Sequence, residues 1–355
     1  MDTVILTDQT ALRAIRAERR RRGLLVWEHL SPAASARVLA AATANEGAID
    51  REELVRLGAL GLENDEAHLL VGSASRRRGG SGIRCHLASR PRPWLTLLKI
   101  RPGLFCCAPL AVTVQFSRSH GIGETAALMM ELMGTYSLDA EVTAGLWDPS
   151  ASLGAPRESG LSHLRLSYEP VLDAGQLRRA SGHMRDGSGT RVFAGAASFA
   201  LPDAASPMET IMVAMLAAPK SAGGFGCKNL SRAGIKVNWR IELTPEARAI
   251  AKMPYVICDA YIPAALSCFE YNGGYHTDER ARMHDENRNA GLAAMGIETI
   301  VINRQQIKDV QALECIAKRV YLRAGKRYRQ TVTGHRQLQN DLLHGLRVGS
   351  GLPPQ

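Results

Sequence analysis

Residues 255–276 read YVICDAYIPAALSCFEYNGGYH, and this stretch decides the fold expected for the C-terminal part of the chain. Its two apolar runs, 255–261 and 266–271, have the length and residue types of β-strands, and a proline between them marks a tight turn. Each run contains one acidic residue, Asp259 or Glu270. Adjacent antiparallel strands place residues opposite each other. We therefore expect Asp259 and Glu270 to lie side by side in one sheet.

The sequence on either side of this hairpin predicts the other elements of an α/β domain. Ser206, followed by a proline and then by a glutamate at the third position, is typical of a helix N-terminus. The expected elements, in order, are a helix from 206 to 218, strands over 235–241, 255–261 and 266–271, a helix over 278–295, a buried strand over 297–302 and a helix over 304–323. This order predicts a mixed central sheet flanked by helices, and not a doubly wound nucleotide-binding fold.

The paired carboxylates indicate a metal-dependent chemistry. Two like charges this close repel each other unless a cation lies between them. Carboxylates together with a substrate phosphate are the usual ligands of protein-bound Mg²⁺, and such an ion promotes hydrolysis of phosphate esters. Glycines at 273 and 274 allow a bulky ligand to approach the backbone, and His276 after them has a side chain suited to proton transfer near neutral pH.

A resemblance to a known family rests on the spacing of these residues. Asp259, the run EYNGGYH at 270–276, the DxxR pattern of Asp285 and Arg288, and then a leucine at 292 and a glycine at 296 occur in order. This pattern resembles the restriction-endonuclease-like PD-(D/E)xK superfamily, and more narrowly the branch related to very-short-patch-repair endonucleases. The Ser-Pro-x-Glu sequence at 206–209 is similar to the opening helix of that branch. The resemblance covers about residues 206–323, and its five separated elements make it specific.

The resemblance implies roles for matched positions. Asp259 and Glu270 would be the ligands of Mg²⁺ or Mn²⁺, with the backbone carbonyl of Tyr271 as a third ligand. Glu209 would assist at the metal directly or through water. His276 would act in proton transfer.

Three further positions complete the expected site. Asp285 and Arg288 would support the metal ligands or contact phosphate. Asn272 stands where the superfamily has a lysine, as in much of this branch. Because an amide carries no positive charge, His276 or a second metal ion must then activate the attacking water, or activity is low.

Structural explanations for several of these residues remain open. The spacing of Glu209 from the helix start is fully explained by a capping box. Asp285 and Arg288, three residues apart on a helix, are also the spacing of an ordinary ion pair. A histidine in a loop, such as His276, is more often structural than catalytic.

The net charge favours a polyanionic partner. The chain has 44 lysines and arginines against 34 aspartates and glutamates, a formal charge of +10 and a pI near 9.5. Part of the excess clusters near the end of the last predicted helix, at Lys318, Arg319, Arg323, Lys326 and Arg327. Phosphate neutralisation by such cations dominates affinity for nucleic acid, so we expect this cluster to contact DNA. Positive charge at a helix C-terminus is the structural alternative.

The N-terminal two-thirds is divided less clearly. We expect residues 1–75 to be a mostly helical segment compatible with a winged helix, and 76–200 to be a mixed α/β region. Within the latter, 86–87, 94–98 and 111–114 have strand patterns, 124–133 and 177–200 have helix patterns, and 140–165 resembles a linker. The nuclease-like domain would span 201–330, and 331–355 would be a C-terminal tail. The region from His86 to Tyr136 also resembles AbiEi-type antitoxin regulators of type IV toxin–antitoxin systems, which bind DNA.

Cysteine usage and hydropathy indicate the compartment. None of the seven cysteines forms a CxxC pair, so we expect neither a structural zinc site nor a disulfide framework. No run approaches the roughly 18 apolar residues of a membrane span, and the four arginines at 19–22 precede only a short apolar run. We therefore expect a cytoplasmic protein without a membrane partner.

These observations predict a metal-dependent DNA endonuclease that hydrolyses phosphodiester bonds. One competing hypothesis is a DNA-binding regulator that keeps the nuclease fold with little or no activity. Another is a component of a defence system that acts mainly through a protein partner.

Overall fold

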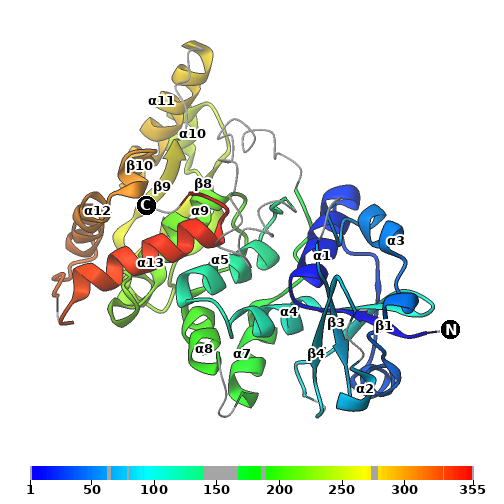
Figure 1. The fold of residues 1–355 in the computed structure, drawn as a ribbon. Helices are drawn as coiled ribbons and strands as arrows, with labels where there is room; N and C mark the ends of the chain where they lie inside the picture. The colour runs from blue at the N-terminus through cyan, green and yellow to red at the C-terminus, as the bar shows by residue number, and fades with distance from the viewer. Residues whose placement is uncertain are drawn as a thin grey trace.

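Two mixed sheets with helices between them and around them form the chain, which confirms the α/β class (Figure 1). The computed structural model describes residues 2–61, 65–77, 80–90, 92–139, 167–184, 189–272, 279–330 and 332–353. The linker expected at 140–165 lies outside these residues. No helix in the described part is both long and apolar enough to cross a membrane.

The N-terminal sheet has six strands in the order β2-β5-β6-β1-β3-β4. The strands are β1 (Val4–Leu6), β2 (Glu28–His29), β3 (Ala67–Val71), β4 (Ile83–Leu87), β5 (Leu97–Arg101) and β6 (Leu104–Cys107). β3 and β4 pair in parallel across the boundary expected at 75/76, so residues 1–75 are neither a separate helical unit nor a winged helix. The prediction missed β1 and β3 because each is short and buried throughout, and such a strand has no alternation of apolar and polar residues.

In the described part of the chain, four helices lie near this sheet. They are α1 (Asp8–Arg22), α2 (Pro32–Ala41), α3 (Arg51–Arg56) and α4 (Pro109–Phe116). Helix α4 corrects the strand expected at 111–114. Pro109 occupies its first turn, where the missing N–H costs nothing. The helix packs against α1 and α5, and its buried valines make these contacts as well as they would in a sheet.

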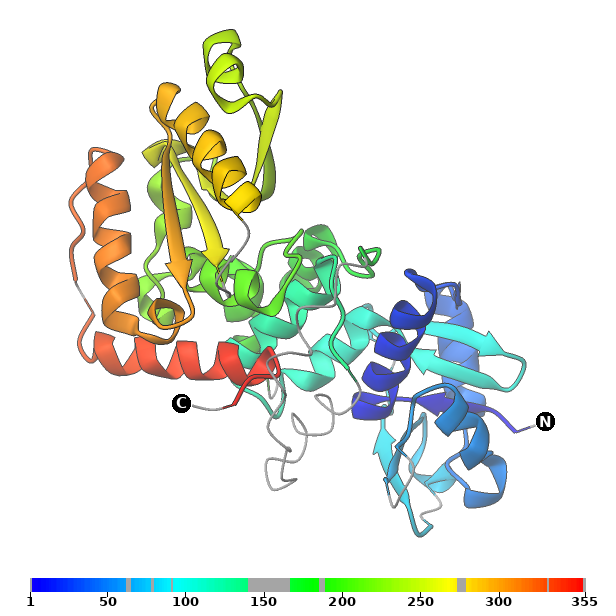
Figure 2. The ribbon, with the colours of Figure 1, turned by 90° about the horizontal axis from the view of Figure 1, so that it is seen from above.

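A layer of helices lies between the two sheets (Figure 2). It contains α5 (Ile122–Met133), α7 (Ala174–His183), α8 (Thr190–Phe199), α9 (Pro207–Ala217) and α13 (His335–Gly349). α13 packs closely on α5, because a Cβ atom on Gly123 would lie 2.8 Å from the carbonyl carbon of Gly345. The tail expected at 331–355 is therefore wrong. Leu342, Leu343 and Leu346 follow helical spacing and are buried.

The C-terminal sheet has the predicted elements, in the order β10-β9-β8-β7. Its strands are β7 (Lys236–Glu242), β8 (Tyr255–Ile262), β9 (Ser267–Asn272) and β10 (Glu298–Asn303), and its helices are α10 (Pro245–Ala251), α11 (Glu279–Ala294) and α12 (Val310–Arg323). The pairs β7–β8 and β8–β9 are antiparallel and the pair β9–β10 is parallel, which confirms a mixed sheet. β10 is an edge strand with Val301 46% exposed, and not a buried one. α12 begins at 310 because the Asp309 side chain caps it there.

A buried ion pair joins the N-terminal part to the helical layer. Arg16 of α1 and Glu131 of α5 have side chains with no exposed surface. Arg16 Nε donates to Glu131 Oε1 at 2.8 Å, and a second contact joins Arg16 Nη2 to Glu131 Oε2. The same carboxylate accepts the Leu138 N–H at 2.9 Å, and Arg19 donates to the carbonyl oxygen of Gly134 at 3.0 Å. Both charges are thus paired and hydrogen-bonded.

Removal of one partner of this pair leaves a buried charge without compensation. We expect Glu131→Ala to lower the free energy of unfolding by about 3–5 kcal/mol, measured by urea denaturation. Glu52→Ala is the control, because Glu52 pairs with Arg56 at 3.6 Å on the surface and should change stability by less than about 1 kcal/mol. Equal effects of the two substitutions would contradict the structural role of Glu131.

Candidate functional site

Asp259 and Glu270 lie at the point where two strands separate. β8 pairs with β9 only from Ala260 to Ile262, and Ala260 is opposite Phe269. Asp259 and Glu270 are therefore the first residues beyond the paired segment on their respective strands. The Tyr271 N–H donates to Asp259 Oδ2 at 2.7 Å, so a side chain replaces the ladder hydrogen bond there. The hairpin thus brings the two carboxylates together, as its sequence predicts.

Glu209 joins them from the first turn of α9 and is 9% exposed. Its Oε1 accepts from Ser206 Oγ at 2.9 Å, and its backbone N–H donates to the same hydroxyl at 3.2 Å. Its Oε2 accepts from the Ala205 N–H at 2.8 Å and from Asn238 Nδ2 at 2.7 Å. Ser206 therefore caps the helix, but the Glu209 carboxylate does not complete a capping box, because it accepts the N–H of Ala205 and not that of Ser206. Both of its oxygens are already hydrogen-bonded. The prediction did not include Asn238, which has no motif that marks it.

The three carboxylates interact electrostatically. Burial is the largest cause that raises the pKa of Asp259, and the negative charges of Glu270 and Glu209 also raise it, to about 7 in all. Burial also raises the pKa of Glu270, against the attraction of the Arg288 guanidinium. The ionised form of Asp259 is thus destabilised near neutral pH. A cation bound beside the carboxylate would stabilise this form.

Arg288 of α11 faces this site. It forms an ion pair with Glu270 Oε1 and donates to the carbonyl oxygen of Ile257 at 2.9 Å. Its side chain is 14% exposed. Asp285 is exposed instead, and its Oδ1 lies 3.9 Å from His284 Nδ1. Arg288 and Asp285 therefore do not act as the ordinary helix ion pair that their spacing allows.

The end of β9 has the remaining predicted residues. Tyr271 contributes its N–H to Asp259, as above, and burial raises the pKa of its phenol. Asn272 is exposed and pairs in register with Asn303 of β10. His276 lies outside the described residues, together with the glycines before it. The predicted proton-transfer group is thus not placed.

The residues fit a magnesium-type ion in donor chemistry. Asp259 and Glu270 supply the carboxylate oxygens that Mg²⁺ and Mn²⁺ prefer, and Mg²⁺ commonly takes only one or two carboxylates from protein. Oxygens of Glu209, Asp259 and Glu270 do not all lie within 4.8 Å of one another. The arrangement therefore matches a two-carboxylate site with Glu209 nearby, and not a tight three-carboxylate centre.

A disulfide joins the same two strands, contrary to prediction. Cys258 precedes Asp259 on β8, and its sulfur is bonded to that of Cys268 on β9. The Cys268 sulfur lies 3.5 Å from Glu270 Oε1. The cysteine spacing gave no signal because the pair forms across a hairpin, between residues ten positions apart, and not within a local motif.

Most of the predicted DNA-binding cations make contacts within the protein. Lys318 pairs with Glu314 at 3.0 Å, and Arg319 pairs with Glu298. Arg323 donates to the carbonyl oxygens of Ala265 and Gly296, each at 2.9 Å, and Lys326 donates to that of Leu230 at 2.6 Å. Arg327 is exposed and forms no side-chain hydrogen bond or ion pair in the described part of the chain. The cluster thus contacts the β8–β9 turn and β10, in addition to carrying charge.

Another group of cations lies at the end of β9. Arg304 follows Asn303, which is in register with Asn272, so it lies at the end of β9. The pKa of Lys308 is lowered by burial and by the charges of Arg347 and Arg304. Arg347 is 5% exposed, and its charge opposes the rise in the Tyr271 pKa. Among the described residues, its Nε and Nη1 have no hydrogen-bond partner. The sequence prediction missed Arg347 because it assigned residues 331–355 to a tail and not to a packed helix.

Comparisons of the chain with protein-family models, with curated proteins and with solved structures gave no match.

The raised pKa of Asp259 predicts a pH-dependent stability. Its folded value of about 7 exceeds the unfolded value of about 4, so the folded state binds the proton more tightly. Stability is therefore lost as pH rises from about 4 to about 7. In Asp259→Asn the charge is absent and the amide oxygen still accepts the Tyr271 N–H. We expect this variant to exceed the wild type by on the order of 1 kcal/mol at pH ~8, after allowance for solvent screening of a half-buried group, and to match it at pH ~4.

Urea unfolding in the presence of a chelator measures this difference. Asp285→Asn is the matched control. Because Asp285 is exposed, this variant should match the stability of the wild type at both pH values. A loss of stability in Asp259→Asn at both pH values would contradict the prediction that the negative charge of Asp259 destabilises the folded state near neutral pH.

Proposed function

We propose that this protein is a metal-dependent DNA endonuclease that hydrolyses phosphodiester bonds, in the PD-(D/E)xK superfamily and its very-short-patch-repair-like branch. The observation that carries the proposal is the pairing of Asp259 and Glu270 at the separation of β8 and β9, where burial raises the pKa of both carboxyls. Half-buried carboxylates that interact electrostatically across neighbouring strands, with cations at the end of the same sheet, suit a metal ion and a phosphate together.

The proposed metal ligands are Asp259, Glu270 and the backbone carbonyl of Tyr271. When bound there, Mg²⁺ or Mn²⁺ supplies polarisation of the phosphoryl oxygen and a lowered pKa of bound water. Asp259 is oriented for this role by the Tyr271 N–H at 2.7 Å. Glu209, held by Ser206 and Asn238, contributes a fixed negative charge from α9.

Positive charge in the site comes from arginine and not from the superfamily lysine. Arg288 forms an ion pair with Glu270 and so neutralises its charge when no metal ion is bound. Asn272, in the lysine position, is exposed at the end of β9 and has an amide that can donate to a phosphate oxygen. Arg304 and Arg347 lie at the same end of the sheet and would supply the charge that Asn272 lacks. His276 is retained as the proposed proton-transfer residue.

DNA is the proposed substrate, held through its phosphates. Among the described residues, Arg347 Nη2 donates to the carbonyl oxygen of Pro353 at 3.1 Å, whereas the buried Nε and Nη1 have no partner, and such nitrogens are costly unless an anion reaches them. Together with Arg304 and Lys308, Arg347 forms a cationic group at the end of β9. Arg327, on the connection after α12, extends the positive surface.

A second proposal is a DNA-binding regulator with the nuclease fold and little activity. Asn272 in the lysine position favours it. So does Arg288, which occupies an oxygen of Glu270 that the metal would need. Under this proposal the cations bind DNA and the carboxylates are structural.

Cleavage of supercoiled plasmid distinguishes these proposals. We expect nicked or linear products with Mg²⁺ or Mn²⁺ and none with a chelator. Asp259→Asn and Glu270→Gln should each lower the rate by at least about 100-fold, since each removes a charge that acts on the transition state. Glu242→Gln is the control, because Glu242 is an exposed carboxylate on the neighbouring strand β7.

Two results would contradict the endonuclease proposal. Cleavage that persists in both Asp259→Asn and Glu270→Gln would remove these residues from the site. Tight, salt-sensitive DNA binding without cleavage under any metal would support the regulator.

The cationic group predicts a defined salt dependence of DNA binding. Loss of one phosphate contact should reduce the slope of log affinity against log salt by about one, whatever the DNA sequence. We expect this smaller slope for Arg347→Met and for Arg304→Met, measured by fluorescence anisotropy at several salt concentrations. Arg304→Met keeps the test available if substitution of the buried Arg347 unfolds the protein. Arg56→Met, on the surface of α3, is the control. Unchanged slopes in both test variants would exclude these residues from the interface.

A further inference from the structure

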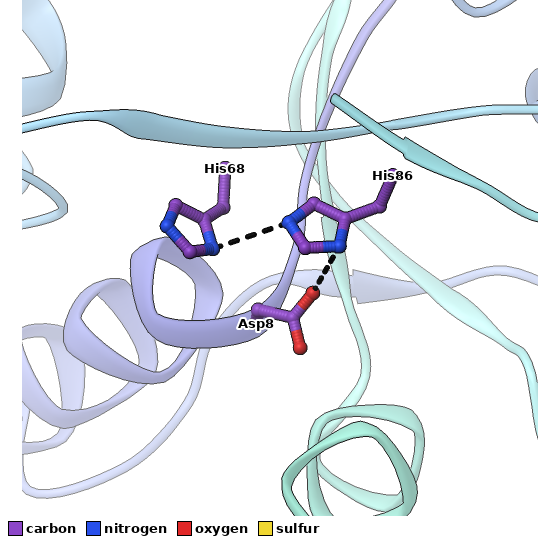
Figure 3. Close-up of side chains that lie close together, drawn as sticks. All are labelled: Asp8, His68 and His86. Atoms are coloured by element: carbon purple, nitrogen blue, oxygen red, sulfur yellow. Dashed lines mark hydrogen bonds and ion pairs between the residues drawn. The ribbon is translucent and has the colours of Figure 1, made fainter. Parts of the chain in front are cut away.

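We propose that Asp8, His68 and His86 bind a divalent transition-metal ion of the zinc class, at a site in the N-terminal sheet separate from the proposed nuclease centre. Asp8 is the first residue of α1, directly after the loop from β1. His68 lies on β3 and His86 on β4, and these two strands pair in parallel. Three elements thus converge on one point of the sheet (Figure 3).

The side chains form a continuous polar contact. His86 Nδ1 lies 2.9 Å from Asp8 Oδ2, and His86 Nε2 lies 3.2 Å from His68 Nδ1. Figure 3 shows the His86 ring joined to both other side chains, through one ring nitrogen each. One ligand atom from each residue can be chosen so that all three lie within 4.8 Å of one another. A metal ion with ligand bonds of about 2 Å needs this degree of convergence.

Burial and charge favour an ion at this position. Asp8 is 7% exposed and His68 is 5% exposed. In the described part of the chain, Asp8 forms no ion pair with a lysine or arginine, and its Oδ2 lies 2.9 Å from His86 Nδ1. An imidazole carries a positive charge only when it is protonated, whereas a divalent cation would supply a permanent positive charge beside this buried carboxylate.

The protonation state of His68 suits a ligand. Burial lowers its pKa to about 4, and the neighbouring charges of His86 and Arg84 act in the same direction. The imidazole is therefore neutral near pH 7, with a lone pair available to a metal.

The backbone is held in place around the three residues. Asp8 has a φ of +47°, in the left-handed region, and its N–H donates to Gln115 Oε1 at 3.3 Å. The His68 N–H donates to Thr10 Oγ1 at 2.9 Å, and its carbonyl oxygen accepts the Thr7 N–H at 3.0 Å. Such contacts orient ligand residues before a metal binds.

The donor set selects the class of ion. Two imidazoles and one carboxylate suit Zn²⁺, Fe²⁺, Co²⁺ or Ni²⁺ better than Mg²⁺, which prefers oxygen. His86 has 31% of its side chain exposed, so its ring has room to turn one nitrogen towards the ion. Three protein ligands leave further coordination positions for water or a substrate on that exposed side.

Titration of the full-length, metal-stripped protein with Co²⁺ tests the proposal. We expect one ion per chain and the visible absorption of a nitrogen- and oxygen-ligated ion, without a thiolate charge-transfer band. That band would instead indicate a cysteine thiolate ligand, which Cys258 and Cys268 beside Glu270 could supply only after reduction of their disulfide. Competition with Zn²⁺ should abolish the cobalt signal.

Two variants and two controls locate the site. His86→Gln and Asp8→Asn should each weaken Co²⁺ binding by more than about 100-fold, because each removes a direct ligand. His29→Gln removes an exposed histidine on β2 and should bind like the wild type, as should the Asp259→Asn, Glu270→Gln double variant. Circular dichroism checks that every variant is folded.

Two outcomes would overturn the site. One is a wild-type protein that binds Co²⁺ no more tightly than His86→Gln does. The other is binding that survives in Asp8→Asn and His86→Gln but is lost in the Asp259→Asn, Glu270→Gln double variant.

Discussion

The arrangement of the whole chain depends on the buried ion pair of Arg16 and Glu131. It joins α1, which covers the N-terminal sheet, to α5, the helix on which α8, α9 and α13 pack. Both charges are fully removed from water, so they are stable only when their hydrogen bonds are complete. Because α9 and α13 contact the C-terminal sheet region in turn, this pair places the two sheets on opposite sides of one helical layer.

Each candidate site contains a carboxylate that the fold buries at least in part. At Asp259 two strands stop pairing, and the carboxylate takes the place of a ladder carbonyl as acceptor for Tyr271. At Asp8 a left-handed residue begins a helix and turns its carboxylate towards two strands. In each case the fold confines negative charge that a cation would stabilise. The proposed cations differ, because one site offers oxygens and the other mainly imidazole nitrogens.

Features set by local interactions were predicted from the sequence, and features set by contacts between separate elements were not. The helix that begins at Ser206 and the hairpin at Pro263 were predicted because their signals are local: a cap, a proline and short apolar runs. The strand expected at 111–114 was wrong because β-branched residues also occur in buried helices, and contacts with α1 and α5 decided the outcome. The Cys258–Cys268 bond and the ion pair of Arg288 with Glu270 each need two separate elements to meet, and no local pattern encodes that meeting.

The amino-acid sequence by itself determined the α/β class, the order of elements in the C-terminal sheet and the proximity of Asp259 to Glu270, because these depend on periodicity, capping and one short turn. Only the tertiary structure decided the six-stranded N-terminal sheet, the docking of α13 through Gly123 and Gly345, and the convergence of Asp8, His68 and His86. The physical reason is that these features depend on close packing and burial between segments far apart in the chain. The free energy of such contacts is set by their neighbours in space.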